Sequence, residues 1–131
     1  MDMSSDENNS PMIVFLTCLL NYDSVRRNYN MSLVSKQDVE GKIKDTYAEG
    51  QEKGDFGYRI LNQKKQLISQ KYMPCPLDKN VEYVDEQGFL QRKDIRLNST
   101  EVFLRLQLMP EMHYIAFDRH KQQLLLINLR K

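Results

Sequence analysis

From residue 56 to the C-terminus, short apolar runs alternate with polar turns. This pattern is typical of β-strands joined by tight connections. Residues 58–61 and 67–72 flank the polar connector 62–65, whose length suits a hairpin. These segments predict a first β-hairpin.

A second hairpin is predicted further along the chain. Residues 81–84 lead through a polar turn to residues 89–90, and Gly88 lies where a turn or bulge needs a positive φ. Ile95 and Leu97 alternate with charged residues, which predicts another strand with one face on the core.

The C-terminal third repeats the period of two. Leu104, Leu106 and Leu108 share one face of a predicted strand, and Pro110 interrupts the pattern because it has no amide proton for a ladder. Residues 113–117 then begin a new strand. This succession over residues 102–117 resembles the late strands of immunoglobulin-like accessory modules, a resemblance of fold pattern that carries no active residues.

Two continuous apolar runs lie near the ends of the chain. Residues 124–127 follow a polar turn at 118–121 and predict a central strand covered on both faces. Residues 12–20 predict a buried strand near the start. The number and spacing of these segments predict an all-β fold: an antiparallel, immunoglobulin-like β-sandwich of about seven strands.

One stretch supports an alternative. Val39, Ile43 and Tyr47 recur every four residues, which predicts a helix near residues 36–49 and an α+β fold. Gly41 and the strand-forming side chains oppose the helix, so both possibilities stay open.

Length and composition indicate one domain. The chain has 131 residues, of which 40% are hydrophobic and 28% charged, and its net charge is +1. Residues 1–11 read as a disordered acidic tail and residues 12–131 as a single β-sandwich domain. The longest apolar run, residues 12–20, is too short to span a bilayer, so we expect a soluble domain without a membrane span. The charge balance does not favour nucleic acid.

The cysteines bear on the compartment. Only Cys18 and Cys75 are present, too few for a disulfide framework, which favours a cytoplasmic protein. If translation starts at Met12, the short apolar segment resembles a lipoprotein leader with Cys18 as the lipidated residue, and a secreted or lipid-anchored protein becomes the alternative. A bridge between the two cysteines stays open. Cys75 lies between two prolines, which predicts an exposed thiol in a loop.

No convergent catalytic set stands out. His113 and His120 lie close in sequence to Glu111 and Asp118, but a strand and a turn would point the two rings apart. Cys75 has no recognisable base, and the glycines lack the spacing of a phosphate loop. We therefore expect no enzyme, no metal and no cofactor.

By elimination, the sequence predicts a non-catalytic protein-interaction or accessory module whose partner is another protein. The alternatives are a small-ligand-binding β-barrel and a β-barrel that binds single-stranded nucleic acid through tyrosines interleaved with basic residues. The sequence gives neither the partner's identity nor the oligomeric state. The predicted partner-binding residues are Tyr58, Tyr72, Met73, Cys75, Met109 and Met112.

Overall fold

The computed structural model describes residues 10–44 and 53–131. These ranges contain nine strands and no helix, so the all-β prediction is confirmed, with nine strands in place of about seven. Accordingly, they hold no helical segment with the length and hydrophobicity of a bilayer span. The strands are β1 (Met12–Asp23), β2 (Asn28–Glu40), β3 (Phe56–Leu61), β4 (Leu67–Met73), β5 (Asp78–Val84), β6 (Leu90–Arg96), β7 (Ser99–Leu108), β8 (Tyr114–Arg119) and β9 (Gln122–Asn128).

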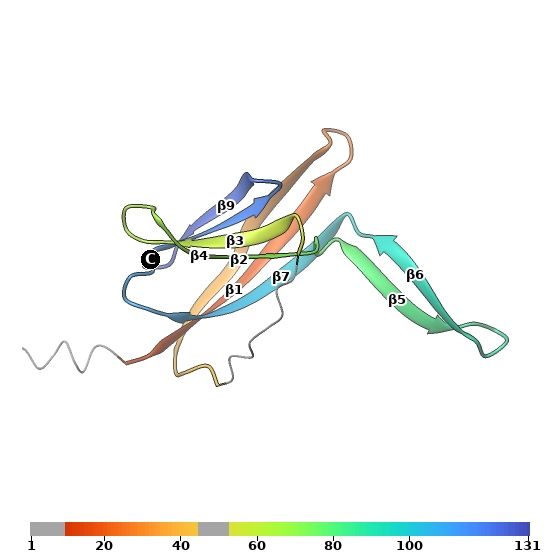
Figure 1. Cartoon of the computed structure of the whole chain (residues 1–131), viewed down its shortest axis with the longest axis horizontal. Coiled ribbons are helices and arrows are strands. Elements are labelled where there is room, and N and C mark those ends of the chain that lie inside the picture. Colours follow the sequence, from red (N-terminus) through yellow and green to blue (C-terminus); the bar gives the residue numbers. More distant parts are fainter. Residues whose placement is uncertain (1–9, 45–52) are drawn as a thin grey trace, which may run out of the picture.

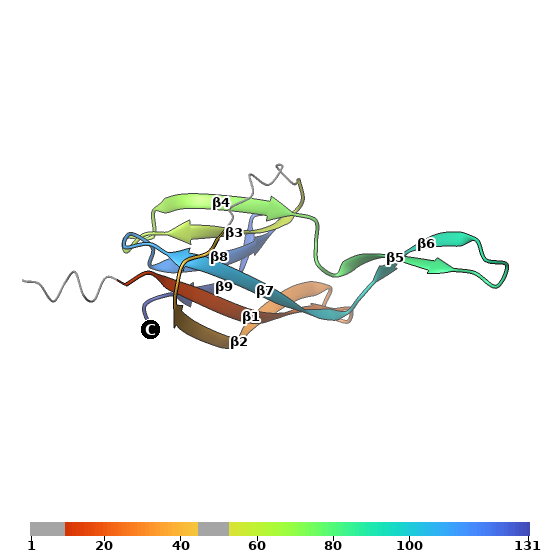
Figure 2. The same cartoon turned by 90° about the horizontal axis from the view of Figure 1, so that it is seen from below.

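The strands form three antiparallel sheets. One has the order β2-β1-β7, a second the order β4-β3-β8-β9, and among the described strands β5 pairs with β6 alone. Figures 1 and 2 show the two larger sheets beside each other, with the β5–β6 pair projecting away from them. Over the described residues neither larger sheet closes on itself, so the barrel that both alternative functions assume is not formed.

Strand β1 shows how the sequence builds a sheet with one buried face. Val14, Leu16, Cys18 and Leu20 are buried, whereas Phe15 between them is exposed. Alternate side chains of a strand point to opposite faces, so β1 presents one apolar face inward. Its central position between β2 and β7 confirms the strand predicted at residues 12–20.

Both larger sheets contribute side chains to one core. From the four-stranded sheet, Phe56, Ile115 and Phe117 are almost fully buried in the same cluster as the inner face of β1. The Phe56 and Phe117 rings stack with their centroids 6.2 Å apart, and Tyr58 meets Phe117 edge-on at 6.1 Å. Aromatic pairs in this distance range add packing energy beyond the area they bury.

The predicted helix is wrong where the structure tests it. Residues 36–40 belong to β2, which pairs with β1 as an exposed edge strand, and residues 41–44 have no regular structure. Val39 is 46% exposed, so the four-residue spacing does not mark a buried helical face. The rest of the predicted helix, residues 45–49, lies outside the described residues, as do residues 1–9 of the predicted tail.

Three finer predictions also need correction. Residues 124–127 lie in β9, which is an edge strand with half-buried leucines and not a central strand. Ile95 belongs to the same strand as Leu90, so it does not begin a new one. The predicted turn at 118–121 is shorter: β8 continues to Arg119, and only His120 and Lys121 connect it to β9.

Candidate interaction arm

Strands β5 and β6 and the turn between them form an arm, residues 78–96. The two strands pair with each other, and among the described strands they meet no other except at the base, through the side chain of Arg96. Figure 1 shows the arm extending from the end of the larger sheets, with no other strand on either of its faces. Every residue of β5 is exposed, as is every residue of β6 except Ile95. An isolated two-stranded ribbon of this kind is marginally stable by itself. The stability of the arm therefore depends on how its base is anchored and on its cross-strand pairs.

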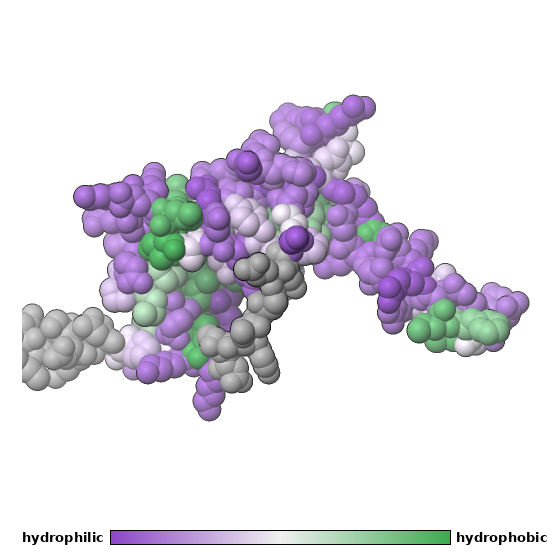
Figure 3. Space-filling model, in the orientation of Figure 1, coloured by the Kyte–Doolittle hydropathy of each residue, from purple (hydrophilic) through white to green (hydrophobic). Residues whose placement is uncertain are grey.

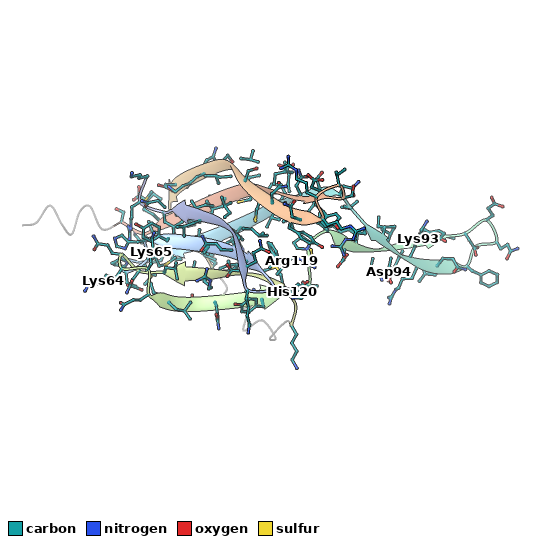
Figure 4. All side chains as sticks on the ribbon, turned by 90° about the horizontal axis from the view of Figure 1, so that it is seen from above. Lys64, Lys65, Lys93, Asp94, Arg119 and His120 are labelled. Carbon is teal, nitrogen blue, oxygen red and sulfur yellow. The ribbon has the colours of Figure 1, made fainter. Side chains whose placement is uncertain are left out.

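Polar cross-strand pairs line the arm. Arg92 Nη2 lies 2.9 Å from Glu82 Oε1, and Asn80 Nδ2 donates to Asp94 Oδ1 at 2.6 Å. Figure 4 shows Asp94 and its neighbour Lys93 on the arm, away from the body. Exposed pairs of this kind each contribute about 0–1 kcal/mol. These pairs present polar groups to solvent and favour this register of β5 on β6. They bury no apolar surface.

The turn at the end of the arm is organised by one carboxylate. Asp85 Oδ1 accepts hydrogen bonds from the backbone N–H groups of Gln87 and Phe89, each at 2.9 Å, and Oδ2 accepts one from the Gln91 amide at 2.9 Å. These bonds, led by that from Phe89, lower the pKa of Asp85. Gly88 adopts a φ of 86°, which confirms the prediction for this position.

The arm ends in an exposed apolar group that we name the tip: Val84, Phe89 and Leu90. Their exposed fractions are 65%, 63% and 70%. Val84 and Leu90 are direct cross-strand partners, so they share a face. Figure 3 shows hydrophobic surface at the far end of the arm, within a largely hydrophilic surround. The acidic residues Asp85 and Glu86 lie in the adjoining turn.

The base of the arm is tied to the body. Leu77, just before β5, is fully buried in the core, and its carbonyl accepts a hydrogen bond from the N–H of Leu97 at 2.8 Å. Arg96 pairs with Asp78 at 3.0 Å and donates to the hydroxyl of Tyr29 in β2. The arm is therefore anchored at its base and free of strand contacts beyond it.

Four of the six predicted partner-binding residues lie inside the body. Cys75 and Met112 are buried, with exposed fractions of 4% and 7%, while Tyr58 and Met73 are half-buried against the core. The predicted exposure of the Cys75 thiol is wrong because the connection from β4 to β5 passes along the core before it reaches Leu77. Neither cysteine is in a disulfide.

The other two predicted residues lie at opposite ends of the four-stranded sheet. Tyr72 pairs with Gly57 near the start of β3, whereas Met109 precedes a loop joined to Leu61, the last residue of β3, through the N–H of His113. Met109 is 47% exposed. The structure does not gather the six residues on one surface, and their role in partner binding stays a prediction.

The tip was not singled out from the sequence. Residues 81–90 were predicted to form a hairpin, but nothing local distinguishes a hairpin that packs on a core from one that leaves the body. A signal was present in retrospect: three large apolar residues flank an acidic turn. Large apolar side chains gain free energy when they are removed from water, and a turn surrounded by solvent does not remove them.

The histidines do not converge. His113 and His120 lie at opposite ends of β8, as their predicted divergence requires. Across residues 10–44 and 53–131, no group of three or more His, Cys, Asp or Glu side chains is arranged to hold a metal ion.

Comparison with known proteins gives no relative: no family model matches the chain, and no curated protein or solved structure matches it either.

Proposed function

We propose that the protein is a non-catalytic interaction module that holds another protein through the tip of its arm. The observation that supports this is the exposure of Val84, Phe89 and Leu90 at the end of a ribbon that meets the other described strands only at its base. Large apolar side chains gathered at an exposed point mark interaction sites, and aromatic residues are frequent anchors of such interfaces.

The charges beside the tip define the chemistry of the partner. Asp85 and Glu86 place two carboxylates next to the apolar group, and Asp85, whose pKa lies below its ordinary value of 3.8, is ionised at neutral pH. An anionic lipid surface would repel them. A protein cleft that is apolar at its centre and basic at its rim satisfies both features.

The fold of the body is part of the proposal. Two antiparallel sheets with buried faces in one core favour an immunoglobulin-like β-sandwich as the scaffold. In this proposal the sandwich is a rigid base, and the arm is the binding element.

Site-specific crosslinking tests the proposal. A photoreactive phenylalanine derivative is placed at position 90, at the tip, or at position 25, because Val25 is 90% exposed in the β1–β2 turn. In the native cell we expect one protein to crosslink in stoichiometric amount at position 90 and none at position 25. The crosslinked partner is identified and then purified without the crosslink. Its affinity for this protein is measured by calorimetry.

The affinity measurement compares Phe89→Ser/Leu90→Ser with the matched control Val25→Ser. We expect the double variant to bind at least about tenfold more weakly, since buried apolar anchors each contribute on the order of 1–2 kcal/mol. Wild type and control should bind equally, with affinity that falls as salt is added. Equal binding by the double variant contradicts the proposal. Self-association through the tip, or binding to vesicles in place of a protein, would overturn it as well.

A further inference from the structure

A cavity of about 850 Å³ opens on the outer face of the four-stranded sheet, at the end where β8 turns into β9. Its volume is in the range of small-ligand sites. None of the tip residues lines it, so it is separate from the proposed interaction site. Among its lining residues are Asp55, Arg59, Tyr72, Asp118, His120 and Lys121.

A glycine in the middle of the sheet lets Tyr72 pack close to the backbone at one wall of the cavity. Gly57 in β3 pairs with Tyr72 in β4 on one side and with Asp118 in β8 on the other. Directly paired residues place their side chains on the same face, so Tyr72 and Asp118 flank a position without a side chain. The Cβ of any other residue at position 57 would lie 2.6 Å from the Tyr72 ring and 2.2 Å from the Lys71 carbonyl oxygen. The Tyr72 ring therefore lies against the backbone at Gly57, and there it forms an aromatic wall of the cavity.

The two acidic residues that the structure places in the cavity wall, Asp55 and Asp118, are already paired. Asp118 accepts two hydrogen bonds from Arg59, from Nε at 2.6 Å and from Nη2 at 3.1 Å. Asp55 lies 3.3 Å from Nη2 of Arg119 and 3.2 Å from Nε2 of His120. A carboxylate bound in this way offers little further attraction to a cation. These pairings reduce the negative charge that the described walls of the cavity present.

Lys121 supplies positive charge that no carboxylate of the described residues offsets. It is exposed in the two-residue β8–β9 turn, with a φ of 66°, and no described carboxylate lies within 4.0 Å of its ammonium group. Arg59 also faces the cavity. The walls therefore combine a lysine that has no carboxylate partner among the described residues with the half-buried ring of Tyr72.

We propose that this cavity binds a small aromatic anion. The flat ring of the ligand packs on Tyr72, and its anionic oxygens face Lys121 and Arg59. Ring stacking and charge each favour binding modestly, and a ligand that carries both groups gains from both. A carboxylate and a phosphate ester share this chemistry. The proposal does not depend on the function of the tip.

Nuclear magnetic resonance titration of the full chain tests the site. Benzoate and phenyl phosphate are the probes; acetate and inorganic phosphate lack the ring, and benzyl alcohol lacks the charge. We expect saturable shifts of the Tyr72 and Lys121 signals with one or both ring-bearing anions at millimolar concentration, and much weaker shifts with the other three compounds. Which of the two anions binds more tightly distinguishes a carboxylate from a phosphate ligand.

The matched variants are Lys121→Asn and Lys65→Asn. Both lysines lie in β-turns with positive φ, 66° and 64°, which asparagine tolerates, so each change removes one charge without straining the backbone. Lys65 is in the β3–β4 turn, and Figure 4 shows it at the opposite end of the sheet from His120. We expect Lys121→Asn to weaken binding ~3–10-fold and Lys65→Asn to leave it unchanged.

Tyr72→Leu provides the second variant. It should bring the affinity for benzoate down to that for acetate, because it removes the stacking surface and leaves the charges in place. Absence of saturable binding by either aromatic anion overturns the proposal, and so does equal affinity in the two lysine variants. Signals outside the cavity that keep their positions show that each variant is folded.

Discussion

The guanidinium carbon of Arg119 lies 3.8 Å from the centre of the Tyr29 ring. Arg119 ends β8 in the four-stranded sheet, and Tyr29 is in β2 of the three-stranded sheet, so this stack joins the two. Arg96, at the base of the arm, faces the same ring at 5.7 Å, and Tyr22 packs on it at 4.8 Å. The Tyr29 ring is thus shared by both sheets and the arm.

Replacement of Tyr29 should weaken the whole fold. We expect Tyr29→Leu to lower the free energy of unfolding by ~1–2 kcal/mol, because it removes an aromatic pair and two cation–π contacts. Tyr29→Phe keeps the ring and loses only the hydroxyl that Arg96 binds, so its loss should be smaller. Urea denaturation measures both. Equal losses would show that the ring contacts contribute nothing.

The ion pair between Arg59 and Asp118 gives a second prediction. Asp118 is 2% exposed, so Arg59→Met leaves a buried carboxylate without its cation and should cost ~3 kcal/mol in unfolding free energy. The double variant Arg59→Met/Asp118→Leu removes both charges and should be more stable than Arg59→Met alone. A double variant no more stable than the single one would refute this account. Thermal and urea unfolding give the comparison.

Stability at high pH should depend on Cys18. Burial raises the pKa of this thiol from its ordinary value of 9.0 to about 11. Between these values the unfolded chain releases the proton and the folded chain keeps it, so unfolding free energy falls as pH rises, by about 1.4 kcal/mol per pH unit. Urea denaturation at pH 8 and pH 10 should show this loss. Tyrosines and lysines also titrate in this range, so the test is the difference from Cys18→Ala, which should lose less between the two pH values.

The turn at the end of the arm should lose its hydrogen-bonded structure as the pH falls, whereas the effect of Cys18 appears as the pH rises. The pKa of Asp85 is lowered from its ordinary value of 3.8, first by the N–H of Phe89 and then by the Gln91 amide. The ionised carboxylate therefore stabilises the turn above the ordinary pKa, and this contribution is lost as the pH falls through the lowered value. The amide signals of Gln87 and Phe89 should move with a midpoint below 3.8. In Asp85→Asn that transition should be absent; if it persists, another group causes it.

The alternation of apolar and polar residues was enough to predict the strands that have one face on the core and the other in solvent. Leu104, Leu106 and Leu108 alternate with polar residues, and β7 lies where they predict it. Strand β2 lacks that signal because most of its side chains are exposed. Its conformation is set by hydrogen bonding to β1, which a local pattern does not contain.

The sites were harder to predict because each depends on contacts between distant segments. The cavity is lined by Arg59, Tyr72 and Asp118, which come from three different strands. Cys75 seemed exposed because of its flanking prolines, yet its connection packs on the core. The sequence showed the Phe89 turn, and only the sheet topology shows that its hairpin leaves the body.

Because the arm is held only at its base, a small rotation there moves its far end over a larger distance. Each of its strands has seven residues, which corresponds to a length of ~23 Å at about 3.3 Å per residue. A rotation of about 10° at Leu77 and Arg96 therefore displaces Phe89 by ~4 Å, the width of an atomic contact. The two residues that set this angle touch the core and the Tyr29 ring. Small changes of packing inside the body are in this way amplified into large changes in where the tip can reach.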